Sequence, residues 1–258
     1  MKAKLKRTKA DVERIVIISD IHFPYHDPIA LTTALSFIKA QKPHTVIMNG
    51  DVVDHFAISK YCNESERVTG EFEVEVALAK SFFKDLRKLV GPDATIIWNE
   101  GNHEVRLKQY IMANAPALAG LECLTMEGLY ELDEYGIIYN HARNRGAFIN
   151  LGGVNIGHFD VVSKHSAYTA KNLVDAHHTS IVQGHTHRLG VHYKTTLNGT
   201  VKGVEGGCLC STEPSYLDTC NWQQGLVLME RERGNDRYNI TEVPIIEGKI
   251  LLGGIRYE

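Results

Sequence analysis

Five short segments of the chain place side chains that can bind metal ions directly after apolar runs. The side chains are carboxylates, an amide and imidazoles, and oxygen and nitrogen donors of this kind suit manganese, iron or zinc. Seven such donors exceed what one ion needs, so the pattern predicts two metal ions. In chain order the segments are Asp20-Ile21-His22, Asn49-Gly50-Asp51 followed by Asp54, Gly101-Asn102-His103-Glu104, Gly157-His158 and Gly184-His185-Thr186-His187.

The spacing inside two of these segments favours a shared ion. Asp20 and His22 are two residues apart, which puts both side chains on one face of an extended chain. His185 and His187 have the same spacing. A single Asp-x-His, or one histidine after a strand, is more often structural than functional. Five segments in order, each closing an apolar strand, predict a common site.

The elements that position these segments alternate between strands and helices. Short β-branched runs predict buried strands at 15–18, 45–48 and 95–98. Asp27 and Pro28 open a helix as its cap and first-turn residue. Apolar residues at every third or fourth position predict helices at 71–90, 104–113 and 166–176. Glycine-punctuated strands follow at 154–157, 180–184, 191–193 and 225–229, whereas residues 119–147 give no clear pattern.

This alternation predicts an α/β fold with parallel or mixed sheets covered by helices. In such sheets ligands gather beyond the carboxyl ends of the strands, which is where the five segments lie. Residues 1–13 are rich in lysine and are predicted to form a basic flexible tail, with nucleic-acid binding as a less favoured role. Residues 14–258 are predicted to form a single domain with a mixed two-sheet core.

The overall composition is that of an ordinary globular protein. Of 258 residues, 43% are hydrophobic and 23% charged, and 28 basic against 31 acidic residues leave a formal charge of −3. Net charge alone therefore identifies no partner. No apolar run approaches the roughly 18 residues needed to cross a bilayer, and the N-terminus lacks the apolar stretch of a signal peptide. We expect a cytoplasmic protein without a membrane partner.

The five cysteines are scattered and odd in number, which predicts free thiols in a reducing compartment. Cys208 and Cys210, with Cys220, could form a metal site, but no fourth cysteine follows. Their spacing favours instead a sheet-buried pair that packs as small apolar residues.

The order of the five segments resembles the motifs of the calcineurin-like metallophosphoesterase superfamily. Those motifs are Asp-x-His, Gly-Asp-x-x-Asp, Gly-Asn-His-Asp/Glu, Gly-His and Gly-His-x-His, and all five occur here between residues 20 and 187. Weaker similarity elsewhere resembles members carried by phages and prophages, for which the location would be the host cytoplasm. The resemblance implies a two-sheet β-sandwich flanked by helices in four αββα layers.

The resemblance also implies how the donors divide between two ions that share Asp51. His103 would face the substrate without binding metal, and Asp54 would orient His103. The ions are expected to be Mn²⁺, with Fe²⁺ or Zn²⁺ as alternatives, and their charge outweighs that of the two ligand carboxylates, so the site attracts an anion. The remaining ligands would be Asp20, His22 and His187 on one ion and Asn102, His158 and His185 on the other.

Such a site predicts hydrolysis of a phosphate ester, with a hydroxide bridging the two ions as nucleophile and His103 assisting the leaving group. Protein phosphatases of the superfamily carry an arginine after the second Asp, where this chain has His55. Histidine cannot form the bidentate fork that grips a terminal phosphate. The prediction is therefore a phosphodiesterase or nuclease acting on DNA, RNA or nucleotides. Basic residues that could line a polyanion path are Arg106, Lys108, Arg143, Arg145, Lys164 and Lys171.

Two other functions stay open at this point. A phosphomonoesterase would act on a phosphoprotein or a small molecule through the same ligands. An inactive scaffold on this fold would show gaps in the ligand set, and none is visible in the sequence.

Overall fold

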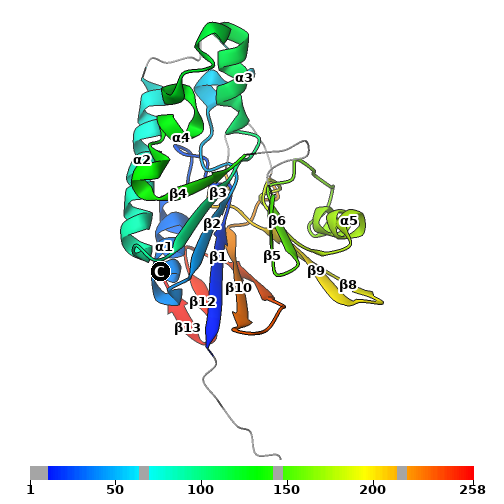
Figure 1. Cartoon of the computed structure of the whole chain (residues 1–258). Coiled ribbons are helices and arrows are strands. Elements are labelled where there is room, and N and C mark those ends of the chain that lie inside the picture. Colours follow the sequence, from blue (N-terminus) through cyan, green and yellow to red (C-terminus); the bar gives the residue numbers. More distant parts are fainter. Residues whose placement is uncertain (1–10, 64–69, 142–147, 214–219) are drawn as a thin grey trace, which may run out of the picture.

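The computed structural model describes residues 11–63, 70–141, 148–213 and 220–258. Two large mixed sheets pack face to face, and helices cover the outer face of each (Figure 1). This is the four-layer αββα architecture that the resemblance to the metallophosphoesterases implies. Among the described residues, no helix has both the length and the apolar character required to span a membrane.

The first sheet has six strands in the order β11-β10-β1-β2-β3-β4. The strands from β1 to β4 run parallel to one another, and β10 and β11 extend the sheet in antiparallel fashion. Their bounds are β1 (Val12–Ile18), β2 (Thr45–Asn49), β3 (Thr95–Asn99), β4 (Ile137–Asn140), β10 (Gly225–Glu232) and β11 (Asn239–Pro244).

The second sheet has five strands in the order β5-β6-β7-β9-β8, of which β6, β7 and β9 are parallel. A separate two-stranded hairpin, β12 (Ile250–Leu252) with β13 (Ile255–Tyr257), packs against the first helix through Tyr257 and Phe37. The bounds of the second sheet are β5 (Phe148–Leu151), β6 (Val154–Gly157), β7 (Ser180–Gln183), β8 (Leu189–Thr196) and β9 (Gly199–Gly206).

The helices divide between the two outer faces. The helices α1 (Pro28–Gln41) and α2 (Glu71–Val90) cover the first sheet, and α5 (Tyr168–His177) covers the second (Figure 1). Asp27 caps α1 as predicted, because its carboxylate accepts the N–H groups of Ile29 and Ala30 at 2.8 and 3.0 Å. The shorter elements are α3 (Val105–Asn114), α4 (Met126–Leu129) and the 3₁₀ helices η1 (Phe56–Ile58), η3 (Pro116–Leu118), η4 (Glu122–Leu124) and η5 (Leu132–Tyr135).

Three apolar interfaces separate the four layers. Alternation along β1 sends Val16 and Ile18 to the interface with the helices, and Ile15 and Ile17 to the interface between the sheets. A smaller cluster lies beneath α5. Both faces of the central strands are therefore buried, which explains their unbroken apolar sequence.

The predicted strands and helices are present with boundaries shifted by a few residues. β1 begins at Val12, before the predicted domain start at residue 14, because Glu13 pairs with β10 and accepts a hydrogen bond from Arg231 at 2.5 Å. Residues 1–10 of the predicted tail lie outside the described residues. Six strands were not predicted, namely β4, β5, β9, β11, β12 and β13.

Candidate metal centre

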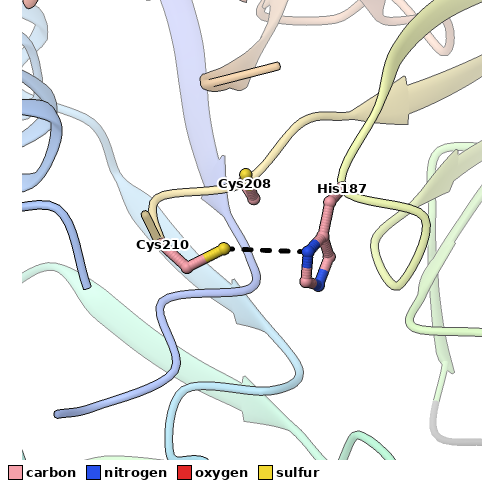
Figure 2. Close-up of side chains that lie close together, drawn as sticks. All are labelled: His187, Cys208 and Cys210. Carbon is pink, nitrogen blue, oxygen red and sulfur yellow. Dashed lines mark hydrogen bonds between the residues drawn. The ribbon is translucent and has the colours of Figure 1, made fainter. Parts of the chain in front are cut away.

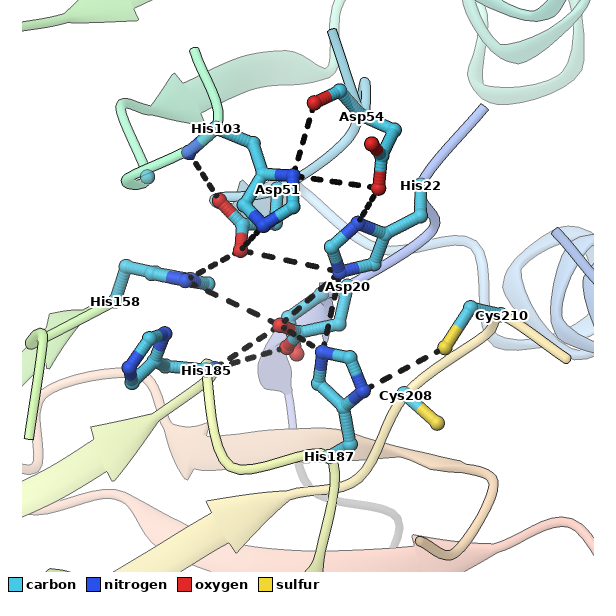
Figure 3. Close-up of polar contacts among 12 residues, drawn as sticks. Asp20, His22, Asp51, Asp54, His103, His158, His185, His187, Cys208 and Cys210 are labelled. Atoms are coloured by element: carbon cyan, nitrogen blue, oxygen red, sulfur yellow. Dashed lines mark hydrogen bonds and ion pairs between the residues drawn. The ribbon is translucent and has the colours of Figure 1, made fainter. Parts of the chain in front are cut away.

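The structure brings the five predicted segments together at one edge of the sandwich. The segments that follow β1, β2 and β3 come from the first sheet, and those that follow β6 and β7 come from the second. Figure 3 shows their side chains pointing toward one another from these different strands. The labelled members are Asp20, His22, Asp51, Asp54, His103, His158, His185 and His187, with Cys208 and Cys210 beside them.

Asp20, His22 and His187 form one compact group of potential ligands. His187 Nε2 lies 3.1 Å from Asp20 Oδ1 and 3.1 Å from His22 Nε2. His22 Nδ1 donates to the Asp54 carboxylate at 2.9 Å, so in the neutral ring its Nε2 lone pair faces the second imidazole. A carboxylate behind a ligating histidine is the usual way to fix the ring, and the arrangement fits a cation among the three side chains.

Asp51, His158 and His185 form a second group. His158 Nδ1 donates to the carbonyl of Asn49 at 2.9 Å, which leaves Nε2 facing Asp51 Oδ2 at 3.0 Å. Asn102 Oδ1 lies 3.2 Å from the same nitrogen. The three facing atoms, one nitrogen and two oxygens, can each accept a hydrogen bond but have no proton to share among them in this arrangement. A bound cation would interact favourably with all three.

Asp51 lies between the two groups. Its Oδ2 is 3.0 Å from His158 Nε2 in one group and 3.8 Å from His22 Nε2 in the other. Asp51 is 1% exposed and Asp20 is fully buried. Buried carboxylates persist only when opposite charge or hydrogen bonds compensate them.

The buried carboxylates attract positive charge strongly. Burial alone would lower the pKa of His158, but the carboxylates of Asp51 and Asp20 raise it to about 10. Burial likewise acts against the charged form of His22, yet its hydrogen bond to Asp54 raises the pKa of that ring to about 8. Burial would raise the pKa of Asp51, but His103 and His158 hold it well below its usual range. The same carboxylates that stabilise protons on the buried imidazoles would also stabilise divalent cations at this centre.

Two glycines allow the segments to approach this closely. A Cβ at Gly50, where φ is +85°, would lie 2.4 Å from His158 Nδ1. A Cβ at Gly101 would lie 2.3 Å from Asp51 Oδ1. Any side chain at either position would displace a predicted ligand.

Glu104 ties the loop after β2 to the loop after β3. Its buried carboxylate accepts backbone N–H groups from Asp51 at 3.0 Å, Val52 at 2.8 Å and Gly101 at 2.7 Å. Burial, with the nearby charge of Asp51, raises the pKa of Glu104 to about 7. The sequence marks this residue as part of a motif, but its role in joining two loops is visible only in the structure.

Asp54 contacts His103 as the sequence predicts, and it also contacts His22. His103 Nδ1 donates to the carbonyl oxygen of Asp54 at 2.9 Å, and Asp54 Oδ2 lies 3.3 Å from the same nitrogen. Arg106 Nη1 binds the Asp54 carbonyl at 2.7 Å, while its Nη2 lies 3.0 Å from His103 Nε2. A guanidinium beside Nε2 competes with a metal ion at that atom, but His103 also forms a group of potential ligands with His22 and Asp51. That His103 faces the substrate without binding metal stays a prediction.

His55, which follows Asp54, lies away from the centre. It is fully buried, with Nδ1 donating to the carbonyl of His103 at 3.2 Å and Nε2 lying 2.8 Å from the Tyr130 hydroxyl. Burial lowers the pKa of His55 to about 3. This histidine is therefore neutral and serves the packing of its loop.

Cys208 and Cys210 are buried, as the sequence predicts, but Cys210 also contacts a predicted metal ligand (Figure 2). Its Sγ lies 3.7 Å from His187 Nδ1. A hydrogen bond from Cys208 lowers the pKa of Cys210 to about 5, against the effect of burial and with a further contribution from His187. A thiolate there accepts a hydrogen bond from Nδ1–H, which leaves His187 Nε2 to face the centre. Nothing in the residue spacing could have indicated this contact.

Residues of the segment that follows β3 line two separate cavities. A cavity of about 720 Å³ opens onto the centre and is lined by His103, and a pocket of about 380 Å³ is lined by its neighbours Asn102 and Arg106. The larger cavity is further lined by His22, Asp51, Asp54, His185 and His187 from the centre and by Tyr25, His26, Phe56, Cys210, Ser211, Glu213 and Trp222.

The predicted polyanion path finds little support among the described residues. No lysine or arginine lines the larger cavity in the described parts of the chain. Lys108 lines a separate pocket, and Lys171 pairs with Asp175 at 2.8 Å. Lys164 lines neither the two cavities near the centre nor the pocket that contains Lys108. Of the described candidates, Arg106 is therefore the one that borders the centre. Arg143 and Arg145 lie outside the described residues.

Comparison with known proteins gives matches over most of the chain. Residues 13–198 match the family described as calcineurin-like phosphoesterase. The Gene 54 protein of Mycobacterium phage D29 is 29% identical over 262 residues, covering 95% of this chain and 99% of that protein. The Gene 54 protein of Mycobacterium phage L5 is 27% identical over 265 residues, with the same two coverages.

Solved structures of similar shape include two proteins named Vps29. Vacuolar Protein Sorting 29 from Cryptosporidium parvum has a TM-score of 0.45 and 13% identity, covering 93% of this chain and 94% of that chain. Wild-type Vps29 from Entamoeba histolytica, complexed with zinc, has a TM-score of 0.43 and 14% identity, covering 92% of this chain and 95% of that chain.

Proposed function

The chain belongs to the calcineurin-like phosphoesterase family, and on that premise we propose that it hydrolyses phosphodiester bonds in nucleotides or nucleic acid with two divalent metal ions. The family match includes all five segments that build the centre. We also place the activity in the cytoplasm of a bacterial host, because both full-length relatives are phage proteins.

The donors at the centre fit a pair of divalent ions. Once bound, the ions would act as Lewis acids on the phosphoryl oxygens and would make water a better nucleophile near neutral pH. The facing donor atoms are oxygen and nitrogen, so we propose Mn²⁺, with Fe²⁺ and Zn²⁺ as alternatives. One ion would be held by Asp20, His22 and His187 and the other by Asn102, His158 and His185, with Asp51 contributing to both.

The observation that carries the choice of a diester is that neighbouring residues of the segment after β3 line two different cavities. The larger cavity borders His103, and the smaller pocket borders the adjacent Asn102. A phosphodiester has a group on each side of its phosphorus and needs room for both. A phosphomonoester needs room for one.

The position of His55 supports the same choice. Its ring is buried against Tyr130 and does not line the cavity. A bidentate grip on a terminal phosphate is therefore missing at that position. Among the arginines that the structure describes, Arg106 is the one that contacts His103, and both of its terminal nitrogens already contact Asp54 or His103.

His103 is placed to serve the leaving group. Donation from Nδ1 to the Asp54 carbonyl fixes the ring, and Nε2 lies 3.7 Å from Asp51 Oδ2 at the centre. A phosphate oxygen accepts a guanidinium N–H better than an imidazole does, so substrate would draw Arg106 away from Nε2. That nitrogen could then take up a proton from solvent and pass it to the departing oxygen, a contribution typically worth about 10² to 10⁴ in rate.

A phosphomonoesterase is the alternative hypothesis, and the nearness of Arg106 to the centre favours it over other enzymes. An arginine freed by substrate could bind a terminal phosphate oxygen. The inactive-scaffold hypothesis has less support, because the donors of both groups converge without a gap.

The test is a comparison of esters with metal-stripped protein reloaded with Mn²⁺. We expect faster turnover of bis(p-nitrophenyl) phosphate than of p-nitrophenyl phosphate, and cleavage of labelled single- or double-stranded DNA. His103→Ala should keep both ions but lose about 10²- to 10⁴-fold in turnover, whereas Asp51→Ala should lose metal itself. Preference for the monoester without cleavage of DNA would overturn the choice of a diester.

A further inference from the structure

The larger cavity has an aromatic wall that the proposed hydrolysis does not use. Trp222, Tyr25 and Phe56 line it, and they come from three separate segments of the chain. The Trp222 ring meets the His187 ring nearly edge-on, with centroids 4.3 Å apart. The wall therefore begins directly beside the metal ligands.

The three rings remain accessible to a ligand. Tyr25 is 50% exposed, and Phe56 and Trp222 are half-buried. Aromatic faces that are large and only partly covered bind planar groups by stacking. The volume of about 720 Å³ lies in the range of sites that enclose one small molecule.

The charges in the cavity suit one phosphate rather than a chain of phosphates. No lysine or arginine lines it within the described ranges, and the Arg106 guanidinium lies beside His103 at the centre. Ser211 and Glu213 line the same cavity and offer a hydroxyl and a carboxylate to the polar edge of a heterocycle. The combination matches a single heterocyclic ring attached to a single phosphate.

We propose that this aromatic wall binds one nucleobase, with Trp222 as the stacking platform, while the attached phosphate lies at the metal centre. The inference rests on the proposed function for the phosphate position and adds the residues that select the substrate. Every base has a π-face, so stacking requires a base without selecting which one. The substrate is then a nucleotide, or the terminal nucleotide of a strand.

The test compares two ligands that differ only in the base, using titration calorimetry on the Mn²⁺-loaded protein. Thymidine 5′-monophosphate should bind about 5- to 150-fold more tightly than 2-deoxyribose 5-phosphate. Trp222→Ala should bring the two Kd values together, and Trp222→Phe should restore most of the ratio. Tyr193→Ala is the matched control, since Tyr193 is an exposed aromatic on β8 that does not line the cavity.

The ratio of Kd values separates stacking from damage to the centre. Trp222 touches His187, so a variant that only disturbed the metal ions would weaken both ligands equally and leave the ratio intact. A ratio near one in the parent protein, or an unchanged ratio in Trp222→Ala, would overturn the base site. Turnover of bis(p-nitrophenyl) phosphate is measured separately. If the protein hydrolyses the diester but its two Kd values are equal, only the proposed base site is overturned. If it does not hydrolyse the diester but binds the nucleotide much more tightly, only the proposed hydrolytic function is overturned.

Discussion

At the scale of single residues, several of the predicted metal ligands have backbone conformations that most residues avoid. Five of them have φ between +50° and +71°, and each such position costs on the order of 1–3 kcal/mol. Aspartate and histidine enter this left-handed region more readily than β-branched residues do. Backbone hydrogen bonds hold two of the turns, from the Asp20 N–H to the Gly50 carbonyl and from the His22 N–H to the Asp51 carbonyl. The five residues are Asp20, His22, Asp51, His185 and His187.

Cys210 gives the first prediction at this scale. Removing the acceptor for His187 Nδ1 should free the ring to rotate, because the 3.7 Å contact fixes its orientation. Loss of such a supporting contact typically costs about 10- to 100-fold in metal affinity. We expect Cys210→Ala to weaken Mn²⁺ binding by about this factor in a calorimetric titration, and Cys210→Ser to weaken it less. Cys123→Ala, at an exposed thiol, is the control, and equal affinities in Cys210→Ala and parent protein would contradict the role.

Most of the candidate centre could be predicted from the sequence because its side chains follow apolar strands in a fixed order. The structure brings together all of the predicted ligands, including Asn102. Cys210 and Arg106 could not be assigned, since their contacts with His187 and His103 depend on how distant loops fold. The role of the basic residues was harder to predict, because sequence alone does not distinguish a solvated lysine from one that lines a cavity.

At the scale of elements, the helix α2 supports the loop that carries Asp54 and His55. Glu75 on α2 is 3% exposed and accepts the His55 N–H at 2.9 Å. Burial raises the pKa of Glu75 from 4.5 to about 8. Between about pH 4.5 and 8 the folded chain therefore keeps a proton that the unfolded chain has released, and stability declines as pH rises through that window.

Glu75→Gln should remove this decline. Glutamine keeps an acceptor for the His55 N–H but carries no charge at any pH. At pH 8.5 we expect the variant to be more stable than the parent by on the order of 2–4 kcal/mol, and at pH 5 to be close to it. Urea unfolding at the two pH values measures the difference, with the exposed Glu73→Gln on the same helix as control. An equal stability gap at both pH values would show that Glu75 does not titrate as argued.

The central elements could be predicted because burial on two faces leaves an unambiguous apolar signal. The helix α2 has the predicted bounds, and β2 and β3 differ from prediction by one residue. The strands β4, β9 and β11 were missed because they mix polar and apolar residues, and β4 and β9 each pair in parallel with a strand that is not a hairpin neighbour. Sequence alone does not specify such pairing.

At the scale of the whole molecule, the centre joins the two sheets. Asp20, His22 and Asp51 follow strands of the first sheet, and His158 and His185 follow strands of the second. Ions held between them would crosslink the sandwich at this edge. Metal binding should therefore contribute to the stability of the entire fold rather than only to the site.

Chelation should lower the unfolding temperature of the parent protein. A ligand present at 100 times its Kd stabilises the folded state by about 2.7 kcal/mol, which corresponds to about 5–11 °C for a chain of this size. Scanning calorimetry with EDTA and with added Mn²⁺ gives the shift. Asp51→Ala should show no such shift, and an identical unfolding temperature for stripped and loaded parent protein would contradict the proposed crosslink.

The most direct test of the two-ion centre is anomalous X-ray diffraction from crystals soaked in Mn²⁺. Two peaks are expected, one among Asp20, His22 and His187 and the other among Asn102, His158 and His185, with Asp51 between them. A single peak, or peaks away from these side chains, would contradict the account.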